Sequence, residues 1–206
     1  MQFEGFTLHP GALDLGAQAA LIGEVLAGVE DAPFYEPMTP WGKPMSVLQT
    51  SFGPWGWLTD RSGYRYADRH PVTGRPWAPM PEQLFGLWAR YADPDQPPDS
   101  CLVNLYRGDS KMGLHVDSDE EDLNAPVLGI SLGDTAIFRL GGPRRTDPSR
   151  TLRLSSGDIN LLTGPARSAH HGVDRILAGS SRLIPGGGRL NLTLRRARRR
   201  AGAERQ

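Results

Sequence analysis

A histidine and an aspartate two residues apart, His115 and Asp117, are the side chains in this sequence best suited to hold a metal ion. If they lie in a strand, they share one face, so the imidazole and the carboxylate can converge on one ion. His171, in the segment 169–173, can supply a third ligand from a distant strand. Two histidines and one carboxylate form the facial triad of non-haem Fe(II) oxygenases. An H-x-D pair by itself is a weak signal, so the iron site is a hypothesis at this point.

The segment 189–195 alternates strictly between polar and apolar side chains. The residues on its polar face are Arg189, Asn191, Thr193 and Arg195. A solvent-facing strand would give the same pattern, and that interpretation stays open. The alternative is a dicarboxylate site, because guanidinium groups bind carboxylates in a bidentate manner. Asn104 and Tyr106, again two residues apart, could add hydrogen-bond donors.

Two amphipathic helices are predicted upstream of these residues. In the first, over residues 17–29, apolar residues recur at helical spacing. In the second, Leu84, Leu87, Trp88 and Tyr91 fall on one face, and Pro81 stands where a first helical turn tolerates it. Both apolar stripes are expected to be packing faces.

From residue 101 onward, short β-type runs alternate with Gly, Pro, Asp and Ser, as in an antiparallel sandwich or barrel. The predicted strands cover 101–106, 112–117, 126–132, 135–140, 151–154, 158–162 and 189–195. We expect the glycine-rich turn 185–188 to be a flexible loop, and the Arg-rich segment from Ala197 to be frayed or disordered.

Length and composition are those of one compact domain, which we expect to span residues 1–206. No segment approaches the ~18 uncharged apolar residues of a membrane span, and the first residues lack the features of a secretory signal. Cys101 is the single cysteine, which excludes an internal disulfide and agrees with a reducing compartment. We therefore expect a cytoplasmic protein without a membrane partner, and a monomer.

The net charge is zero but unevenly distributed along the chain. Residues 1–138 hold 8 basic and 19 acidic side chains, whereas residues 139–206 hold 15 basic side chains, all of them Arg, and 4 acidic ones. One interpretation is a basic surface for a polyanion, since Arg binds phosphate well. The other is that the two halves mingle in the fold.

Several short motifs stand in a recognisable order and spacing. Those in the second half of the chain are Asn104-Leu105-Tyr106, His115-Val116-Asp117-Ser118-Asp119-Glu120, Ala136-Ile137-Phe138, Gly141-Gly142, Arg145-Thr146-Asp147-Pro148, His171-Gly172 and the segment 189–195. Those upstream are Met38-Thr39-Pro40, Met45-Ser46, Gly56-Trp57, Gly63-Tyr64-Arg65-Tyr66 and Pro76-Trp77. Together they resemble the AlkB-type alkylation-repair dioxygenases over about residues 34–197, and the joint match is far more specific than any one motif.

The resemblance implies a mostly β fold with flanking α-helices. Its core would be a double-stranded β-helix, or jelly roll, over residues 101–197, with a nucleotide-recognition lid over about residues 34–78. Fe(II) would be held by His115, Asp117 and His171. The residues implied to bind 2-oxoglutarate, which is used together with O2, are Asn104, Tyr106, Arg189, Asn191 and Arg195. Arg195 is expected to pair with the distal carboxylate. His170 stands where the family usually has an aromatic residue, so the choice of His171 depends on the following Gly172.

The resemblance also assigns substrate contacts. Trp57 would stack on a flipped base opposite His115, and Tyr64 and Tyr66 would contact the substrate backbone. Asp119 and Arg145 match residues that the family places around the base. An aromatic slot accepts any flat base, at roughly 1–3 kcal/mol per stacked base, and a carboxylate favours the positive charge of a base methylated at a ring nitrogen. Without the resemblance, core or hairpin packing would explain the three aromatic residues better.

The implied function is oxidative demethylation of N-alkylated bases, of the 1-methyladenine and 3-methylcytosine type, in single-stranded DNA or RNA, with release of formaldehyde. Within the family, an oxygenase that modifies RNA or tRNA is the main alternative. Two others are a non-catalytic nucleic-acid-binding jelly roll, which the intact triad disfavours, and an oxygenase for protein or lipid, which the aromatic lid disfavours. An EF-hand starting at Asp117 is excluded, because it needs Gly at the position of Asp122 and Glu at that of Leu128.

Overall fold

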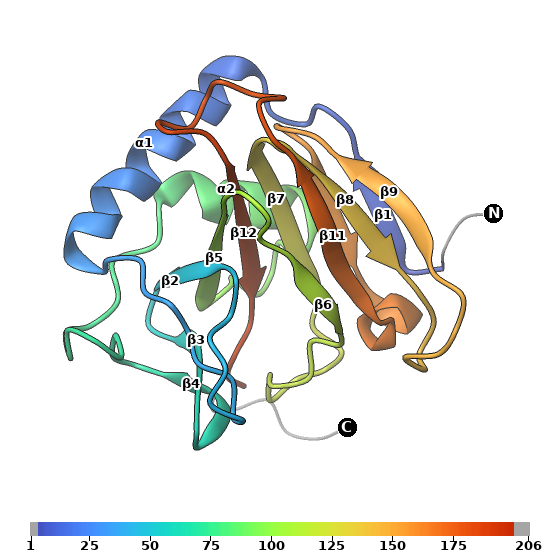
Figure 1. The fold of residues 1–206 in the computed structure, drawn as a ribbon, viewed down its shortest axis with the longest axis horizontal. Helices are drawn as coiled ribbons and strands as arrows, with labels where there is room; N and C mark the ends of the chain where they lie inside the picture. The colour runs from blue at the N-terminus through green and yellow to red at the C-terminus, as the bar shows by residue number, and fades with distance from the viewer. Residues whose placement is uncertain (1–3, 200–206) are drawn as a thin grey trace.

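Two antiparallel sheets face each other in the computed structural model, which describes residues 4–199 (Figure 1). In spatial order, the larger sheet contains β1 (Phe6–His9), β10 (Ile159–Leu162), β7 (Val127–Gly133), β12 (Arg189–Arg195), β5 (Ser100–Tyr106) and β2 (Leu48–Phe52). The smaller sheet contains β6 (Met112–His115), β11 (His171–Leu177), β8 (Thr135–Leu140) and β9 (Arg150–Leu154). A separate hairpin is formed by β3 (Gly56–Asp60) and β4 (Gly63–Ala67). This arrangement confirms the predicted jelly roll.

Two helices pack against the outer face of the larger sheet. Helix α1 (Leu15–Asp31) begins after Asp14, whose carboxylate accepts a hydrogen bond of 2.8 Å from the amide of Ala17. Helix α2 (Glu82–Tyr91) follows Pro81, its N-cap residue. Both helices were predicted, and both are slightly longer than their apolar stripes because the stripe marks only the buried turns. No helix within residues 4–199 has the length and apolarity needed to cross a membrane.

The hydrophobic core has two parts, one on each face of the larger sheet. The outer part joins the helices to the sheet, with Val25 of α1, Trp88 of α2 and Leu192 of β12 among its buried residues. The inner part lies between the two sheets and includes Phe138 and Leu154. Strand β12 lies in the middle of the larger sheet, so its leucines pack against the helices while its polar face points into the jelly roll. The alternative of a solvent-facing strand is therefore wrong.

Several strands escaped prediction. Strands β1, β2, β3 and β4 have no counterpart among the predicted runs, and β11 was expected only as a strand without stated bounds that carries His171. Strand β2 pairs with β5 as an edge of the larger sheet, so the segment 34–78 is not wholly a lid over the core. Strand β6 ends at His115, and Asp117 lies in the loop that follows. The predicted strand 112–117 was thus too long, because the chain leaves the sheet before the acidic run begins.

Two segments predicted to be loose make well-defined contacts. Ala197 donates its amide to Asp99 at 2.5 Å, and Arg198 pairs with Glu121 at 2.6 Å, so residues 197–199 are held in place. The rest of the tail predicted to be disordered, residues 200–206, lies outside the described residues. In the glycine-rich turn, Gly188 donates its amide to the Asp134 carboxylate at 3.2 Å, and its carbonyl accepts from the Asp134 amide at 2.8 Å.

Candidate metal centre and substrate cavity

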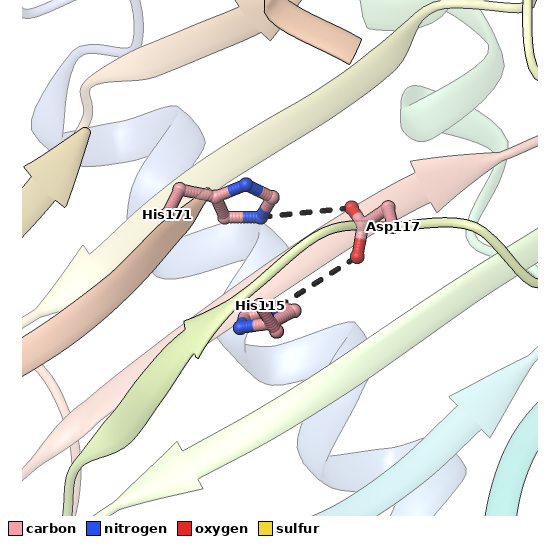
Figure 2. A group of neighbouring side chains, drawn as sticks. All are labelled: His115, Asp117 and His171. Atoms are coloured by element: carbon pink, nitrogen blue, oxygen red, sulfur yellow. Dashed lines mark ion pairs between the residues drawn. The ribbon is translucent and has the colours of Figure 1, made fainter. Parts of the chain in front are cut away.

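His115, Asp117 and His171 come together between the two sheets (Figure 2). One ligand atom from each residue lies within 4.8 Å of the other two. The Nε2 atoms of His115 and His171 are 3.7 Å and 3.8 Å from the two carboxylate oxygens of Asp117. Three donors at these separations can face a single ion between them. The predicted triad is therefore confirmed as a cluster.

Strand pairing positions the two histidines. In the pairing of β11 with β6, His171 stands opposite His115. The two strands approach closely at the next residue, because a Cβ on Gly172 would lie 2.5 Å from the Met112 carbonyl oxygen. Only glycine fits there without moving the backbone. The His-Gly pair in the sequence is thus a packing requirement that brings the two imidazoles onto one site.

Backbone carbonyls orient both rings. The Nδ1 atom of His115 lies 2.9 Å from the Gly113 carbonyl oxygen, and that of His171 lies 3.0 Å from the Ala169 carbonyl oxygen. Each Nδ1 can donate its proton to the carbonyl, which leaves the lone pair of Nε2 for a metal. Both Nε2 atoms are the ones that face Asp117.

The donor set and its electrostatics fit a ferrous ion. Oδ2 of Asp117 is buried without a hydrogen-bond partner in the described part of the chain, as expected for an atom reserved for a cation. Burial alone would raise the pKa of Asp117, but Arg195, His171 and His115 together hold it well below its usual range. Burial lowers the pKa of His171 to about 4, so its imidazole is neutral and able to coordinate.

His170 is not part of the cluster. Its amide donates to the Gly142 carbonyl at 2.9 Å, and its Nδ1 lies 3.4 Å from the same oxygen. Neighbouring residues of an extended chain point in opposite directions. The ambiguity left by the His-His sequence is thereby resolved in favour of His171.

The triad opens into a cavity of about 780 Å³. Most of the predicted site residues line it; these are Asn104, Tyr106, His115, Asp117, His171, Asn191, Arg195, Trp57, Tyr64, Asp119 and Arg145. Two predicted residues, Arg189 and Tyr66, do not. A cavity of this size has room for a co-substrate beside the metal and for a further planar group.

The comparisons with known proteins agree with this geometry. A profile of the 2OG-Fe(II) oxygenase superfamily matches residues 5–195. The chain is 63% identical over 194 residues to an alpha-ketoglutarate-dependent dioxygenase AlkB homolog of Caulobacter vibrioides (strain NA1000 / CB15N). The aligned region covers 94% of this chain and 88% of that protein. The chain belongs to the AlkB-type 2OG-Fe(II) oxygenases.

More distant relatives are similar over the same span. The chain is 40% identical over 185 residues to the alpha-ketoglutarate-dependent dioxygenase AlkB of Escherichia coli (strain K12), with 88% of this chain and 85% of that protein covered. The solved structure of OsALKBH1 superposes with a TM-score of 0.76 at 28% identity, over 95% of this chain and 99% of the other. This AlkB-type enzyme is thus an Fe(II)- and 2-oxoglutarate-dependent dioxygenase, with O2 as the second co-substrate.

A buried ionic network supports the metal end of the AlkB-type site. Arg195 lies 2.8 Å from Oδ1 of Asp117 through Nη2 and 3.1 Å from Glu120 through Nε. Arg167 lies 3.1 Å from the other oxygen of Glu120 and donates to the Asp117 carbonyl at 3.3 Å. The sequence analysis missed the roles of Glu120 and Arg167. Glu120 was hidden in an acidic run, and nothing local marked Arg167 as buried.

Arg189 is fully buried, and its hydrogen-bond partners are neutral groups, although the buried carboxylate of Asp158 acts on its charge. It donates to Ser131 at 2.8 Å, Asn191 at 3.0 Å and the Leu154 carbonyl at 3.3 Å. Within the described part of the chain, none of the ion pairs involves this guanidinium. Burial lowers the pKa of Arg189 to about 10. A buried cation that forms no direct ion pair is costly, and an anionic ligand nearby would relieve that cost.

The β3–β4 hairpin brings aromatic residues to the cavity. The Trp57 and Tyr64 rings stack with centroids 5.6 Å apart and planes at 18°, and the indole N–H donates to Asp119 at 2.6 Å. Tyr66 was expected to contact the substrate backbone, but it is buried and donates its hydroxyl to Glu120 at 2.7 Å. That expectation does not fit the structure, because Tyr66 lies behind the cavity wall. Arg145 lies at the rim and donates to the Leu114 carbonyl at 2.5 Å.

Some arginines of the second half of the chain pair with acidic residues of the first half. Arg196 pairs with both Asp93 and Asp122 at 3.2 Å, and Arg198 pairs with Glu121 at 2.6 Å. The prediction that the two halves mingle is confirmed for these pairs.

Proposed function

We propose that this oxygenase oxidatively demethylates N-alkylated bases of the 1-methyladenine and 3-methylcytosine type in single-stranded DNA, with RNA as a second candidate polymer. One observation carries the proposal: the cavity that contains the metal triad is also lined by Trp57, Tyr64 and Asp119. Two aromatic faces and a carboxylate beside an oxidising centre suit a flat, positively charged base.

The overall reaction is balanced by the co-substrates. With Fe(II), 2-oxoglutarate and O2 bound, the site would hydroxylate a C–H bond of the N-methyl group. One atom of O2 would go to the methyl carbon. The other would enter succinate as 2-oxoglutarate loses CO2. The resulting N-hydroxymethyl group then breaks its C–N bond to give formaldehyde and the restored base. The strand is repaired without being cut.

The protein side chains have distinct tasks in this scheme. Trp57 stacks on the extruded base opposite His115, while Tyr64 stacks on the Trp57 ring and supports it. The negative charge of Asp119 favours the methylated cation over the neutral repaired base. Because Trp57 donates its indole N–H to Asp119, the ring and the carboxylate are held together as one recognition unit. Product release follows from the loss of the positive charge.

We place 2-oxoglutarate between Arg195 and Arg189. The sequence suggested that Arg195 binds the distal carboxylate, and we propose instead that Arg189 does so. Arg195 contacts the metal ligand Asp117, so it belongs to the metal end of the co-substrate. Arg189 lies six residues away along β12 and forms no direct ion pair within residues 4–199. It does not line the cavity itself but donates to Asn191, which does, so a small shift of its side chain would bring it to the distal carboxylate. Asn104, Tyr106 and Asn191 line the cavity and supply hydrogen-bonding groups.

We further propose that the enzyme acts as a monomer in the cytoplasm on exposed single strands. The test is formaldehyde release from matched single- and double-stranded oligonucleotides, DNA and RNA, that carry 1-methyladenine or 3-methylcytosine. Unpaired strands should react faster, because a duplex must first lose stacking and pairing at a cost of a few kcal/mol. Substrate-independent decarboxylation of 2-oxoglutarate is followed in parallel. Decarboxylation with no formaldehyde from any oligonucleotide would reject the repair function.

A further inference from the structure

Trp41 projects into solvent at the mouth of the catalytic cavity. Its side chain is 78% exposed, more than any other large apolar side chain in the described chain. It nevertheless lines the same cavity as the metal triad. Single exposed apolar residues are common on protein surfaces. An indole at the entrance to an active site, however, has a ring face available to a ligand.

The backbone around Trp41 is built as a fixed turn. Thr39 donates its amide and its hydroxyl to the Lys43 carbonyl at 2.8 Å and 2.9 Å, and Gly42 donates to the Thr39 carbonyl at 2.8 Å. Gly42 has a φ of +76°, which favours glycine. Further along, Ser46 exchanges hydrogen bonds of 2.9 Å and 3.0 Å with the backbone of Lys111. These bonds tie the turn to the jelly roll, so Trp41 is presented on a defined support.

Three positive side chains belong to the same turn, cavity or neighbouring hairpin tip as Trp41. Lys43 follows it in the turn, and Lys111 lines the same cavity. The Arg61 guanidinium, at the tip of the β3–β4 hairpin, lies 4.0 Å from the position that a Cβ on Gly42 would take. All three are exposed, and none takes part in the ion pairs formed within residues 4–199. These three cations stand in the half of the chain that is otherwise acidic.

An exposed aromatic ring among unpaired cations is the combination that binds single-stranded nucleic acid, with the ring stacking on a base and the cations contacting phosphates. Trp57, which is proposed to stack on the extruded base, is itself stacked on Tyr64. Trp41 is therefore not needed for that base. Trp41 makes none of the ring contacts found among the described residues. We propose that Trp41 stacks on the unmodified base adjacent to the extruded one and forms a second nucleobase subsite. This inference rests on the proposed nucleic-acid function.

Binding is measured directly, independently of turnover. The protein, loaded with 2-oxoglutarate and with Mn²⁺ in place of iron, is titrated into fluorescein-labelled single-stranded DNA that carries one 1-methyladenine, and anisotropy gives the Kd. Three oligonucleotides are compared: one with all bases present, and two with an abasic site either 5′ or 3′ to the methylated base. The variants are Trp41→Ala, Trp41→Phe and, as an equally exposed apolar control on α1, Leu15→Ala.

Trp41→Ala should raise the Kd for the complete oligonucleotide about tenfold, and Trp41→Phe should raise it less. On one of the two abasic oligonucleotides, wild type and Trp41→Ala should bind equally, because the stacking partner is missing. Leu15→Ala should bind all three like wild type. An unchanged Kd in Trp41→Ala, or an equal loss on all three oligonucleotides, would overturn the inference. Formaldehyde release by wild type is scored separately, so a failure of the demethylase proposal is distinguishable from a failure of Trp41 stacking.

Discussion

The guanidinium of Arg195 and the carboxylate of Asp117 form a buried ion pair, with 2.8 Å between Nη2 and Oδ1. One partner is a metal ligand, and the other projects from β12, the strand that carries the polar face of the jelly roll. The same arginine contacts Glu120, which in turn holds Arg167 and Tyr66. The position of the metal ligand is thus coupled to the position of the side chain proposed to meet the co-substrate.

Arg195→Lys tests this coupling. The charge is kept, but an ammonium group cannot reach Asp117 and Glu120 with a planar fork. We expect the KM for 2-oxoglutarate to rise by about tenfold or more, together with weaker metal binding. Arg196→Lys is the matched control, because Arg196 pairs with Asp93 and Asp122 and not with a member of the metal cluster. Decarboxylation assays at varied 2-oxoglutarate and at varied Fe(II) give the KM for 2-oxoglutarate and the apparent metal affinity. An unchanged dependence on 2-oxoglutarate would contradict the role of Arg195.

The two adjacent histidines give a second test. His171→Ala removes a donor of the triad, so turnover should be lost and Mn²⁺ affinity should fall, while circular dichroism shows a retained fold. His170→Ala should remain active, because His170 contacts Gly142 and not the metal cluster. The reverse outcome, an active His171→Ala and an inactive His170→Ala, would show that the third ligand is misassigned.

Tyr66→Phe separates a structural role from a substrate contact. The variant leaves the buried Glu120 carboxylate without one of its donors, so the free energy of unfolding should fall by about 1–3 kcal/mol. Affinity for oligonucleotides should stay unchanged. Tyr64→Phe, at a 45% exposed position of the same hairpin, should change stability by less than about 0.5 kcal/mol. Denaturant titrations provide the comparison. Weaker oligonucleotide binding by Tyr66→Phe at full stability would restore the strand-contact assignment.

Trp57→Ala should affect the nucleic acid and spare the co-substrate. Loss of the stacking face should raise the KM for a methylated oligonucleotide about tenfold, while the KM for 2-oxoglutarate measured without oligonucleotide stays the same. Trp57→Phe keeps a ring but loses the N–H donor to Asp119, so its KM should be intermediate. Formaldehyde release gives the KM for the methylated oligonucleotide, and decarboxylation gives the KM for 2-oxoglutarate. Equal losses in both assays would point to a damaged fold instead of a lost contact.

Cys101 should be chemically silent in the native protein. It is fully buried in β5, and burial raises the pKa of its thiol to about 12, so almost no thiolate forms near pH 8. A thiol reagent such as DTNB should therefore label the chain only on unfolding, at a rate that follows denaturant concentration. Cys101→Ser should keep activity but lose labelling. Rapid stoichiometric labelling of the native protein would show that β5 opens far more readily than its central position implies.

The sequence by itself determined the features that depend on local period or on motifs in fixed order. Strict alternation over 189–195 identified a strand with one polar and one apolar face, because neighbouring side chains of a strand point in opposite directions. The spacing of apolar residues located both helices, and the ordered motifs indicated the family, the jelly roll and the triad. These inferences need only the residues themselves and their neighbours along the chain.

Tertiary structure alone decided the features that depend on strand order. Pairing of β11 with β6 sets His171, and not His170, beside His115. The central place of β12 turns its polar face inward and leaves Arg189 as a buried cation. Glu120 and Tyr66 became parts of the ionic network behind the metal ligand, although the sequence marked them as an acidic run and a strand contact. Contacts between residues far apart in the chain are not encoded in any local period, which is the physical reason that the sequence left them undecided.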